Sequence, residues 1–272
     1  MEKIIKLIAN KLFLFDQKRK RKIKKGPLKN YFYYGTYYDK RYFETFEKEI
    51  VNLIKNIITD GNVYDVGAHY GFYSSLFSTL TEGTVYSFEP NPYCLKVLKK
   101  NLEINNFNKV KLFDFGLGDE EKGVEMSIIL DNLARSTCED KLKDRYEKGE
   151  HKIEKVRVGI RVLDNLNLPE PKLVKIDVEG FEVKVIKGMA KTIGSYLPDF
   201  IIETHGKDKE DTRKTIVQIL EFLKEFGYYC MSVENNYLIN EIEDAPMSGH
   251  LYASVNKDKV FKIINLLKNK KI

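Results

Sequence analysis

The most constraining feature of the sequence is residues 62–91, which read NVYDVGAHYGFYSSLFSTLTEGTVYSFEPN. An apolar run ends at Asp65, and a turn that contains Gly67 and Gly71 leads into a helix and then a second apolar run, which ends at Glu89. This order predicts a β-α-β unit. Glycines in the turn let the backbone approach a ligand, and an acid after the second strand is placed to accept hydrogen bonds from ribose hydroxyls. The unit therefore predicts a nucleoside-like ligand.

The form of the turn distinguishes between nucleosides. A dinucleotide site has the pattern G-x-G-x-x-G and holds a pyrophosphate at the helix N-terminus. Here the pattern is G-x-x-x-G, and the carboxylate of Asp65 would repel a pyrophosphate. S-adenosylmethionine has no phosphate, so Asp65 can favour its cationic end while the helix N-terminus favours its carboxylate. The unit favours S-adenosylmethionine; the alternative is an ordinary β-α-β unit with two turn glycines.

Size and cysteine content describe an ordinary globular protein. The 272 residues can form one large α/β domain or two small ones. Cys94, Cys138 and Cys230 are far apart and odd in number, which indicates neither a disulfide framework nor a zinc site. They are most simply buried thiols of a cytosolic protein, so we expect a cytoplasmic location. No segment approaches the length that spans a bilayer.

The net charge of +6 comes from one basic run, residues 18–25, and the rest of the chain is nearly neutral. Apolar residues at helical spacing precede this run: Ile4, Ile5, Ile8, Leu12 and Phe15. We expect residues 1–26 to form a basic amphipathic arm. Such an arm can lie on an anionic membrane surface, contact nucleic acid or a partner, or remain solvated. Its charges follow the apolar part, unlike those of a signal peptide.

The remaining sequence alternates between helical and strand patterns. Residues 27–61 are expected to form an aromatic and helical cap, whose tyrosines can cover a cleft, form a sugar platform or pack in the core. Residues 62–256 are expected to form the main domain, and residues 257–272 a C-terminal helix. The predicted helices are 44–58, 92–106, 179–193, 208–226 and 257–268. The predicted strands beyond the first unit are 110–115, 123–130, 155–163, 172–177 and 199–204, with a strand pair around Asn235.

This order predicts a doubly wound, mostly parallel, Rossmann-like sheet with an antiparallel C-terminal strand pair. The turn GLGDEEKG follows the strand 110–115, and the polar segment 131–151 is expected to be a substrate-facing loop. Ligands of such sheets bind at the carboxyl ends of the strands. Polar residues lie at these predicted ends: Asp65, Glu89, Asp114, Asp177, Glu203, Thr204 and His205.

These residues give the chain a resemblance to the FkbM family of S-adenosylmethionine-dependent methyltransferases, which has the class I fold. The segments that carry the resemblance are VYDVGAHYGFYS, YSFEPNP, GLGD, VLDNL, VKIDVEGFEVKVIKGM and FIIETH, within residues 44–206. The family usually has Asn where this chain has His69, although an imidazole can also donate a hydrogen bond.

The resemblance implies methyl transfer to an oxygen atom of a sugar, a glycan-like molecule or a natural product. It also implies roles for residues that match the motifs. Asp65, Gly67 and Gly71, with His69 beside them, would hold the methionine end of the cofactor. Glu89 would bind the ribose. Asp114 and Phe115 are similar to the adenine-side contacts at the end of the third strand.

Methylation of an alcohol requires alignment of the acceptor oxygen and removal of its proton. His205 is the first candidate for the general base because an imidazole titrates near neutral pH, and Asp177 is the second. Glu179 and Glu203 lie at the same predicted edge. Asp177, Glu203 and His205 can instead bind Mg²⁺, which lowers the pKa of a bound hydroxyl. Simpler alternatives are a helix cap for Asp177 or Glu179, a lysine pair for Glu203 and a loop position for His205.

Two other functions compete with this hypothesis. Amino-group methyltransferases commonly carry [DN]-P-P-[YFW] after the fourth strand, where this chain reads DVEG. That difference disfavours N-methylation of DNA or glutamine. We do not expect nucleic acid as the partner, although an RNA methyltransferase that uses the basic arm is an alternative. A non-catalytic module that binds S-adenosylmethionine is the second alternative, and the acids at every strand end disfavour it. The sequence does not identify the acceptor or the oligomeric state.

Overall fold

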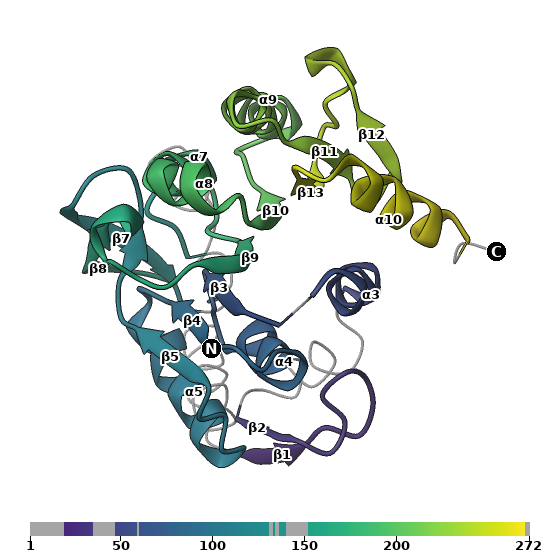
Figure 1. The fold of residues 1–272 in the computed structure, drawn as a ribbon. Coiled ribbons are helices and arrows are strands. Elements are labelled where there is room, and N and C mark those ends of the chain that lie inside the picture. Colours follow the sequence, from purple (N-terminus) through teal and green to yellow (C-terminus); the bar gives the residue numbers. More distant parts are fainter. Residues whose placement is uncertain are drawn as a thin grey trace, which may run out of the picture.

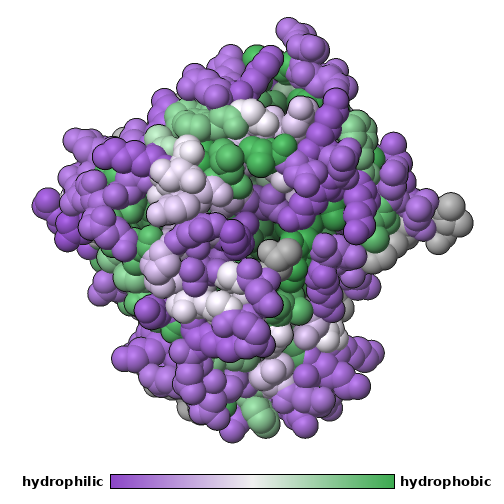
Figure 2. Space-filling view, viewed as in Figure 1, coloured by the Kyte–Doolittle hydropathy of each residue, from purple (hydrophilic) through white to green (hydrophobic). Residues whose placement is uncertain are grey.

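The computed structural model describes residues 19–34, 47–58, 60–130, 133, 136–139 and 152–269 (Figure 1). The amphipathic half of the predicted arm and most of the predicted loop 131–151 lie outside the described residues. In Figure 2, hydrophilic side chains cover most of the visible face, with smaller hydrophobic areas among them. No helix within the described ranges is both long enough and apolar enough to cross a membrane.

A central sheet organises the described chain. Its strand order is β12-β11-β13-β10-β9-β3-β4-β5. The strands are β3 (Asn62–Val66), β4 (Val85–Phe88), β5 (Val110–Phe113), β9 (Pro171–Ile176), β10 (Asp199–Thr204), β11 (Tyr229–Ser232), β12 (Tyr237–Ile239) and β13 (Gly249–Ser254). The pairs from β5 to β10 are parallel, whereas β13 pairs antiparallel with both β10 and β11. The predicted doubly wound sheet and its antiparallel C-terminal end are confirmed.

Helices cover both faces of this sheet (Figure 1). One face carries α3 (Lys48–Ile57), α4 (Phe72–Leu80) and α10 (Lys257–Asn269), and the other carries α7 (Glu182–Lys187), α8 (Ala190–Tyr196) and α9 (Lys209–Glu225). Side chains of a strand alternate between the two faces. In β10, Ile201 packs with the first group of helices, whereas Phe200 and Ile202 pack with the second. The sheet is therefore buried on both sides, as its continuous apolar runs predict.

The β-α-β unit forms as predicted, with β3 and β4 parallel and α4 between them. The next helix, α5 (Pro92–Ile104), has Pro92 in its first turn, where the missing N–H costs nothing. Asn91 caps this helix, because its side-chain oxygen accepts hydrogen bonds from the N–H groups of Tyr93 and Cys94. The chain thus turns sharply after Glu89, and this turn positions the end of β4.

The region after β5 differs from the prediction of one strand and one turn. Strand β5 ends at Phe113, and the predicted turn contains a short strand, β6 (Gly116–Leu117). β6 pairs in parallel with β8 (Ile153–Arg161), which pairs antiparallel with β7 (Lys122–Ile129). These strands form a separate three-stranded sheet, order β6-β8-β7. The sequence pattern predicted β7 and β8 as strands but not that they belong to a second sheet. The alternation of apolar and polar residues along a strand does not show which sheet the strand joins.

The helix predicted over residues 179–193 is wrong as a single element. It is divided into α7 and α8 at Gly188 and Met189. A Cβ at Gly188 would lie 1.9 Å from the carbonyl oxygen of Gly118, so the backbones meet there. Asp164, in the short 3₁₀ helix η2 (Leu163–Asn165), accepts hydrogen bonds from the N–H groups of Lys191 and Thr192. A capping residue far away in the sequence therefore starts α8.

The described part of the N-terminal region is a hairpin. β1 (Lys20–Lys22) pairs antiparallel with β2 (Phe32–Tyr34). Ile23, Leu28 and Tyr33 are buried against the core. The side chains of Asn101 in α5 and of Asn105, the C-cap residue of α5, form hydrogen bonds with both the N–H and C=O groups of β2. The basic residues 20–22 thus form a paired strand, and Tyr31, Tyr33 and Tyr34 pack with the hydrophobic core.

The C-terminal third confirms the predicted strand pair and the predicted helices 208–226 and 257–268. β11 and β12 form the predicted pair around Asn235 and Asn236. The second short 3₁₀ helix, η3 (Ile242–Asp244), leads to β13, which inserts between β10 and β11. The last helix, α10, packs its apolar side on the face that also carries α3. The insertion of β13 matters for the site because it pairs His250 with Glu203.

Candidate active site

A cavity of about 230 Å³ lies at the carboxyl ends of the parallel strands. Residues from four strand ends line it: Gly67, His69, Glu89, Asn91, Asp177, Glu179 and Glu203. Apolar side chains, among them Leu117, Ile160 and Phe181, complete the wall. The cavity therefore connects Glu89, after β4, with Asp177 and Glu179, after β9, and with Glu203 near the end of β10.

Glu89 is held in a fixed orientation at one end of this cavity. Its Oε2 accepts a hydrogen bond of 2.6 Å from the N–H of His69, and its Oε1 accepts one of 2.8 Å from the N–H of Asn91. Burial raises the pKa of Glu89 to about 7, although these two N–H groups favour the charged form. Each carboxylate oxygen keeps a second lone pair. Glu89 can therefore accept further hydrogen bonds from a ligand in the cavity.

Asn91 adds a donor beside Glu89. Its side-chain oxygen caps α5, which fixes the amide, and the residue is almost fully buried while lining the cavity. Among the residues that the structure describes, its Nδ2 has no hydrogen-bond partner. Asn91 was not predicted as a site residue, although it lies in the YSFEPNP segment. Its helix-capping position was the available signal.

The turn after β3 brings two strand ends into contact. Gly67 has φ 86°, and a Cβ there would lie 1.7 Å from the carbonyl oxygen of Asp177, so only glycine fits. Gly71 also has a positive φ and precedes α4, but it does not line the cavity. The ring of His69 stacks on Tyr70 at 4.0 Å, and burial lowers its pKa to about 4, so the imidazole is neutral at pH 7. Gly67 and His69 thus form one wall of the cavity.

Asp65 lies beneath this turn and is not among the residues lining the cavity. It is fully buried, and its Oδ2 accepts a hydrogen bond of 2.5 Å from Ser74, which in turn accepts one from Ser87. Burial raises its pKa, and the charge of Lys175 opposes that effect. Its Oδ1 has no hydrogen-bond partner among the described residues. Asp65 therefore supports the turn from below without lining the cavity, and its contact with the methionine end stays a prediction.

Asp114 and Phe115 are not brought to the cavity. Asp114 is exposed, and the ring of Phe115 packs near those of Phe88 and Phe113, with centroids 6.0 and 5.5 Å away. The next two residues, which form β6, line the cavity instead. Because β5 ends before Asp114, the chain has already turned toward the second sheet at this point.

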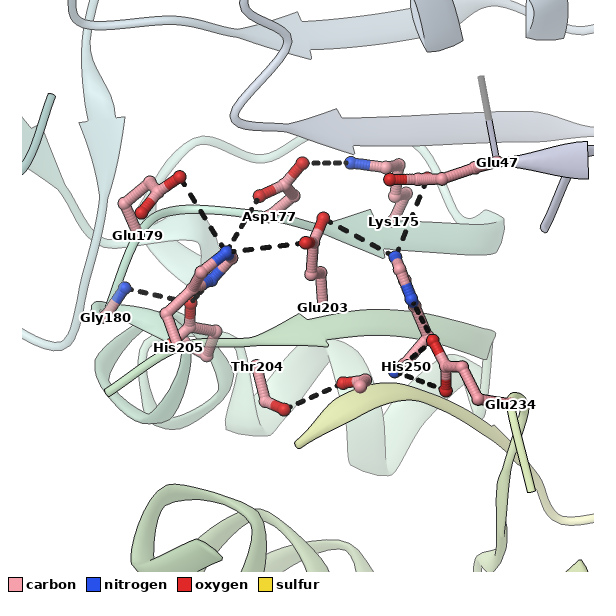
Figure 3. Close-up of polar contacts among 12 residues, drawn as sticks. Glu47, Lys175, Asp177, Glu179, Gly180, Glu203, Thr204, His205, Glu234 and His250 are labelled. Carbon is pink, nitrogen blue, oxygen red and sulfur yellow. Dashed lines mark hydrogen bonds and ion pairs between the residues drawn. The ribbon is translucent and has the colours of Figure 1, made fainter. Parts of the chain in front are cut away.

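A group of charged side chains occupies the other end of the cavity, and we call it the strand-end cluster (Figure 3). Its members come from the residue before α3, from β9, β10 and the loops after them, from the start of α7, from the turn between β11 and β12, and from β13. They are Glu47, Lys175, Asp177, Glu179, Glu182, Glu203, His205, Glu234 and His250. Carboxylates outnumber cations in this cluster even when both histidines carry a proton.

Lys175 supplies the buried cation of the cluster. Its side chain is 1% exposed, its Nζ donates a hydrogen bond of 3.0 Å to Oδ2 of Asp177, and it lies 4.4 Å above the ring of Tyr73. Burial alone would lower its pKa, but Asp177 and Asp65 outweigh burial and raise it. The hydroxyl of Tyr73 donates a hydrogen bond to Glu47. Lys175 therefore remains an ammonium and fixes Asp177 at the cavity edge.

The turn after β9 is bent so that its acids face the cavity. Glu179 and Gly180 both have positive φ, and the N–H of Gly180 donates a hydrogen bond of 2.9 Å to Oε1 of Glu182. Burial raises the pKa of Glu179 to about 8, although His205 opposes it. Helix α7 has Phe181 as its N-cap, with no side-chain hydrogen bond there. Neither Asp177 nor Glu179 therefore caps the helix.

His205 is enclosed by acids. Its Nδ1 lies 2.9 Å from Oε1 of Glu182, which is fully buried. Its Nε2 lies 3.5, 3.8 and 4.0 Å from carboxylate oxygens, those of Glu203, Glu179 and Asp177. Burial alone would lower the pKa of His205, but Glu182 and Glu203 raise it well above 6.5. The ring does not line the cavity. A histidine in this setting holds a proton or another cation rather than accepting a proton from a substrate.

His250 repeats this arrangement on the other side of Glu203. Its Nδ1 lies 2.6 Å from Oε1 of Glu234, and its Nε2 lies 3.4 Å from Glu203 and 3.6 Å from Glu47. Burial alone would lower the pKa of His250, but Glu203 and Glu234 raise it to about 10. Glu203 thus lies between two imidazoles, and its Oε1 faces His205 while its Oε2 faces His250 (Figure 3).

The structure therefore brings Asp177, Glu203 and His205 together, as the positions of their strands predict. The other members of the cluster, apart from Glu179, were not predicted as site residues. Lys175 and Glu182 lie within the VKIDVEGFEVKVIKGM segment, and this was the available signal. Nothing in the sequence around His250 predicts that it belongs to the site, because only the pairing of β13 with β10 places it opposite Glu203.

Comparisons with known proteins identify the family of this chain. A family model described as the methyltransferase FkbM domain matches residues 65–230. The hexuronic acid methyltransferase AglP of Haloferax volcanii is 26% identical over 175 residues, covering 62% of this chain and 67% of that protein. Methyltransferase 1 of Beauveria bassiana is 25% identical over 176 residues, covering 58% and 71%. A crystal structure of an FkbM methyltransferase from Methylobacillus flagellatus has 17% identity and a TM-score of 0.47, covering 72% of this chain and 45% of that chain.

The family model covers more than half of the chain, from Asp65 near the end of β3 to Cys230 in β11. The sheet order, with its antiparallel β13 beside β10, is that of the class I methyltransferase fold that the resemblance predicts. The chain belongs to the FkbM family of S-adenosylmethionine-dependent methyltransferases.

Proposed function

We propose that this chain methylates a hydroxyl oxygen of a sugar, a glycan or a related small molecule. The observation that carries the proposal is the single cavity that runs from Glu89 to the acids Asp177, Glu179 and Glu203. One end suits a nucleoside and the other suits a polyhydroxylated acceptor, because carboxylates accept hydrogen bonds from hydroxyls. The name of the relative AglP, a hexuronic acid methyltransferase, supports a sugar as the acceptor class.

The residues at the Glu89 end fit the nucleoside half of S-adenosylmethionine. Glu89 offers acceptors for two hydroxyls, Nδ2 of Asn91 offers a donor without a partner among the described residues, and Leu117 and Ile160 offer apolar walls for a base. We assign ribose binding to Glu89 and the methionine end to the turn that contains Gly67 and His69. When bound, the cofactor supplies a methyl group activated by its sulfonium.

The proton of the acceptor hydroxyl requires a base among the residues that line the cavity. We assign the role of general base to Glu179. It lines the cavity, and in the described part of the chain its carboxylate has only His205 as a partner, at 3.8 Å. Asp177 is held by Lys175, and we assign it to orienting the hydroxyl. His205, the first candidate from the sequence, is enclosed by carboxylates and becomes a positioning residue in this proposal.

A divalent cation held by Asp177, Glu203 and His205 belongs to the same proposal. Oxygen or nitrogen atoms of these three residues lie within 4.8 Å of one another. When bound, such a cation lowers the pKa of a coordinated hydroxyl. The chain's own contribution is to hold the three side chains, through Lys175 behind Asp177 and Glu182 behind His205.

The test is an acceptor panel analysed by mass spectrometry. Uronic acids, neutral sugars and amino sugars are incubated with S-adenosylmethionine, and methyl ethers are distinguished from methylated amines. We expect methyl ethers with at least one sugar. Glu179→Gln should reduce turnover at least a hundredfold while the affinity for S-adenosylhomocysteine is unchanged. Glu120→Gln, at an exposed ion pair with Lys122, is the control. Methylation confined to nitrogen would contradict the proposal.

Membrane contact through residues 1–26 remains a separate proposal. Its support is the sequence alone, since residues 1–18 lie outside the described part. Lys20 and Lys22 belong to β1 and could still face an anionic surface, because both are exposed. Co-sedimentation with anionic vesicles, with and without residues 1–18, is the measurement. Equal sedimentation of the two proteins would contradict the proposal.

A further inference from the structure

The two histidines of the strand-end cluster are arranged in the same asymmetric way. Each Nδ1 makes a hydrogen bond to a glutamate, at 2.9 Å for His205 and 2.6 Å for His250. Each Nε2 instead faces carboxylates at 3.4 to 4.0 Å, beyond the usual hydrogen-bond range of about 2.7 to 3.2 Å. An Nδ1–H bound to a carboxylate leaves the Nε2 lone pair free to bind a metal, and this pairing is common behind metal-binding histidines.

The spacing on the Nε2 sides fits atoms that share a cation. Two ligand atoms each about 2.1 Å from a metal lie about 3.0 Å apart at 90° and about 4.2 Å apart when opposite. His205 lies 3.5 Å from Oε1 of Glu203 and 4.0 Å from Asp177. His250 lies 3.4 Å from Oε2 of Glu203 and 3.6 Å from Glu47. Every one of these distances falls in the range for ligands of one ion.

We propose that the strand-end cluster binds two divalent cations, bridged by the carboxylate of Glu203. Asp177, Glu203 and His205 hold the first ion, and Glu47, Glu203 and His250 hold the second. Glu182 and Glu234 orient the two imidazoles through Nδ1. Mixed carboxylate and imidazole ligands suit Mn²⁺ or Zn²⁺ better than Mg²⁺, which prefers oxygen alone. This inference deepens the proposed function. Any role of the two ions in catalysis rests on the proposed methyl transfer.

The second ion has independent support from the burial of His250. The residue is only 7% exposed, and its Nε2 has no hydrogen-bond partner among the described residues, although it points at Glu203 and Glu47 (Figure 3). A buried polar atom without a hydrogen bond is costly unless something else binds it. A proton on Nε2 is the simpler occupant, but the contacts of 3.4 and 3.6 Å are too long for good hydrogen bonds.

The experiment measures metal stoichiometry on the full chain. Protein treated with a chelator is dialysed against MnCl₂, and bound manganese is determined by mass spectrometry and by electron paramagnetic resonance. We expect two Mn²⁺ per chain and a spectrum that shows coupling between the ions, because one carboxylate bridges them. His250→Ala should retain one Mn²⁺ and lose the coupling. Glu120→Gln, away from the cluster, should retain both.

The wild-type protein alone can overturn the inference, so a variant that fails to fold does not decide it. One Mn²⁺ or none per wild-type chain, or two uncoupled ions that His250→Ala leaves in place, would refute it. Circular dichroism establishes that each variant is folded. Titration of S-adenosylhomocysteine into the metal-free protein is measured separately. If that ligand does not bind while two Mn²⁺ do, the proposed function fails and the paired cation site stands.

Discussion

The backbone N–H of His69 donates a hydrogen bond of 2.6 Å to Oε2 of Glu89. This contact joins the turn after β3 to the end of β4, so the two halves of the β-α-β unit position one carboxylate between them. The same turn touches the end of β9, because Gly67 lies against the carbonyl of Asp177. One turn therefore connects the nucleoside end of the cavity with the strand-end cluster.

Replacing Glu89 should weaken cofactor binding. We expect Glu89→Ala to reduce the affinity for S-adenosylhomocysteine at least tenfold, about 1.4 kcal/mol, because the acceptor for the ribose hydroxyls is lost. Isothermal titration calorimetry measures the effect. Glu82→Ala is the control, since Glu82 is exposed and pairs only with the surface residue Lys109 in the described structure. An unchanged affinity in Glu89→Ala would remove Glu89 from the site.

The affinity for S-adenosylhomocysteine should rise with pH. Burial raises the pKa of Glu89 to about 7, so its carboxylate is largely protonated at pH 6 and largely ionised at pH 8. The ionised form is the better acceptor, and roughly a tenth of the groups are ionised one unit below the pKa. We expect the dissociation constant to fall by about five- to tenfold from pH 6 to pH 8. The Glu89→Gln variant should show a flat profile, and an equal slope in that variant would assign the pH effect to another group.

The close approach at Gly67 should make it intolerant of a side chain. Gly67→Ala combines a positive φ with a Cβ 1.7 Å from the carbonyl oxygen of Asp177, so the strand ends must separate. We expect a loss of about 3 kcal/mol or more in the free energy of unfolding. Gly227→Ala is the matched control, because φ is 78° and no described atom lies within 4 Å of its Cβ. Gly227→Ala should reduce the free energy of unfolding by only about 1 kcal/mol. Urea unfolding measures both, and similar losses would contradict the steric argument.

Removal of the buried cation should destabilise the fold. Lys175→Met leaves Asp177 and Asp65 without their buried ammonium, and breaking a buried ion pair typically costs about 3 to 5 kcal/mol. Lys172→Met provides the comparison on the same strand, since that side chain is 51% exposed and pairs with Glu170 at the surface. Lys172→Met should reduce the free energy of unfolding by less than about 1 kcal/mol. Urea unfolding at pH 7 distinguishes the two, and a Lys175→Met protein as stable as wild type would contradict the role assigned to Lys175.

Much of the fold was predictable from local patterns. The apolar runs at β3, β4, β9 and β10 and the helical spacing of α5, α9 and α10 are properties of short segments, and the structure confirms them. The predicted helix over residues 179–193 failed because a cap from Asp164 and a backbone contact at Gly188 divide it. Both contacts join residues far apart in the sequence, and the spacing of apolar residues within one segment cannot predict such contacts.

The order of the apolar runs in the sequence is enough to predict that Glu89, Asp177 and Glu203 meet at one edge of a parallel sheet. Which of the predicted residues line the cavity follows from the folded chain: Asp65 is buried beside the cavity, and Asp114 and Phe115 lie outside it. The folded chain also brings in a residue from the C-terminal third. His250 joins Glu203 through the insertion of β13 beside β10. The reason is physical. Strand-end position follows from local hydrophobic pattern, whereas side-chain direction and antiparallel pairing depend on packing against residues distant in the chain.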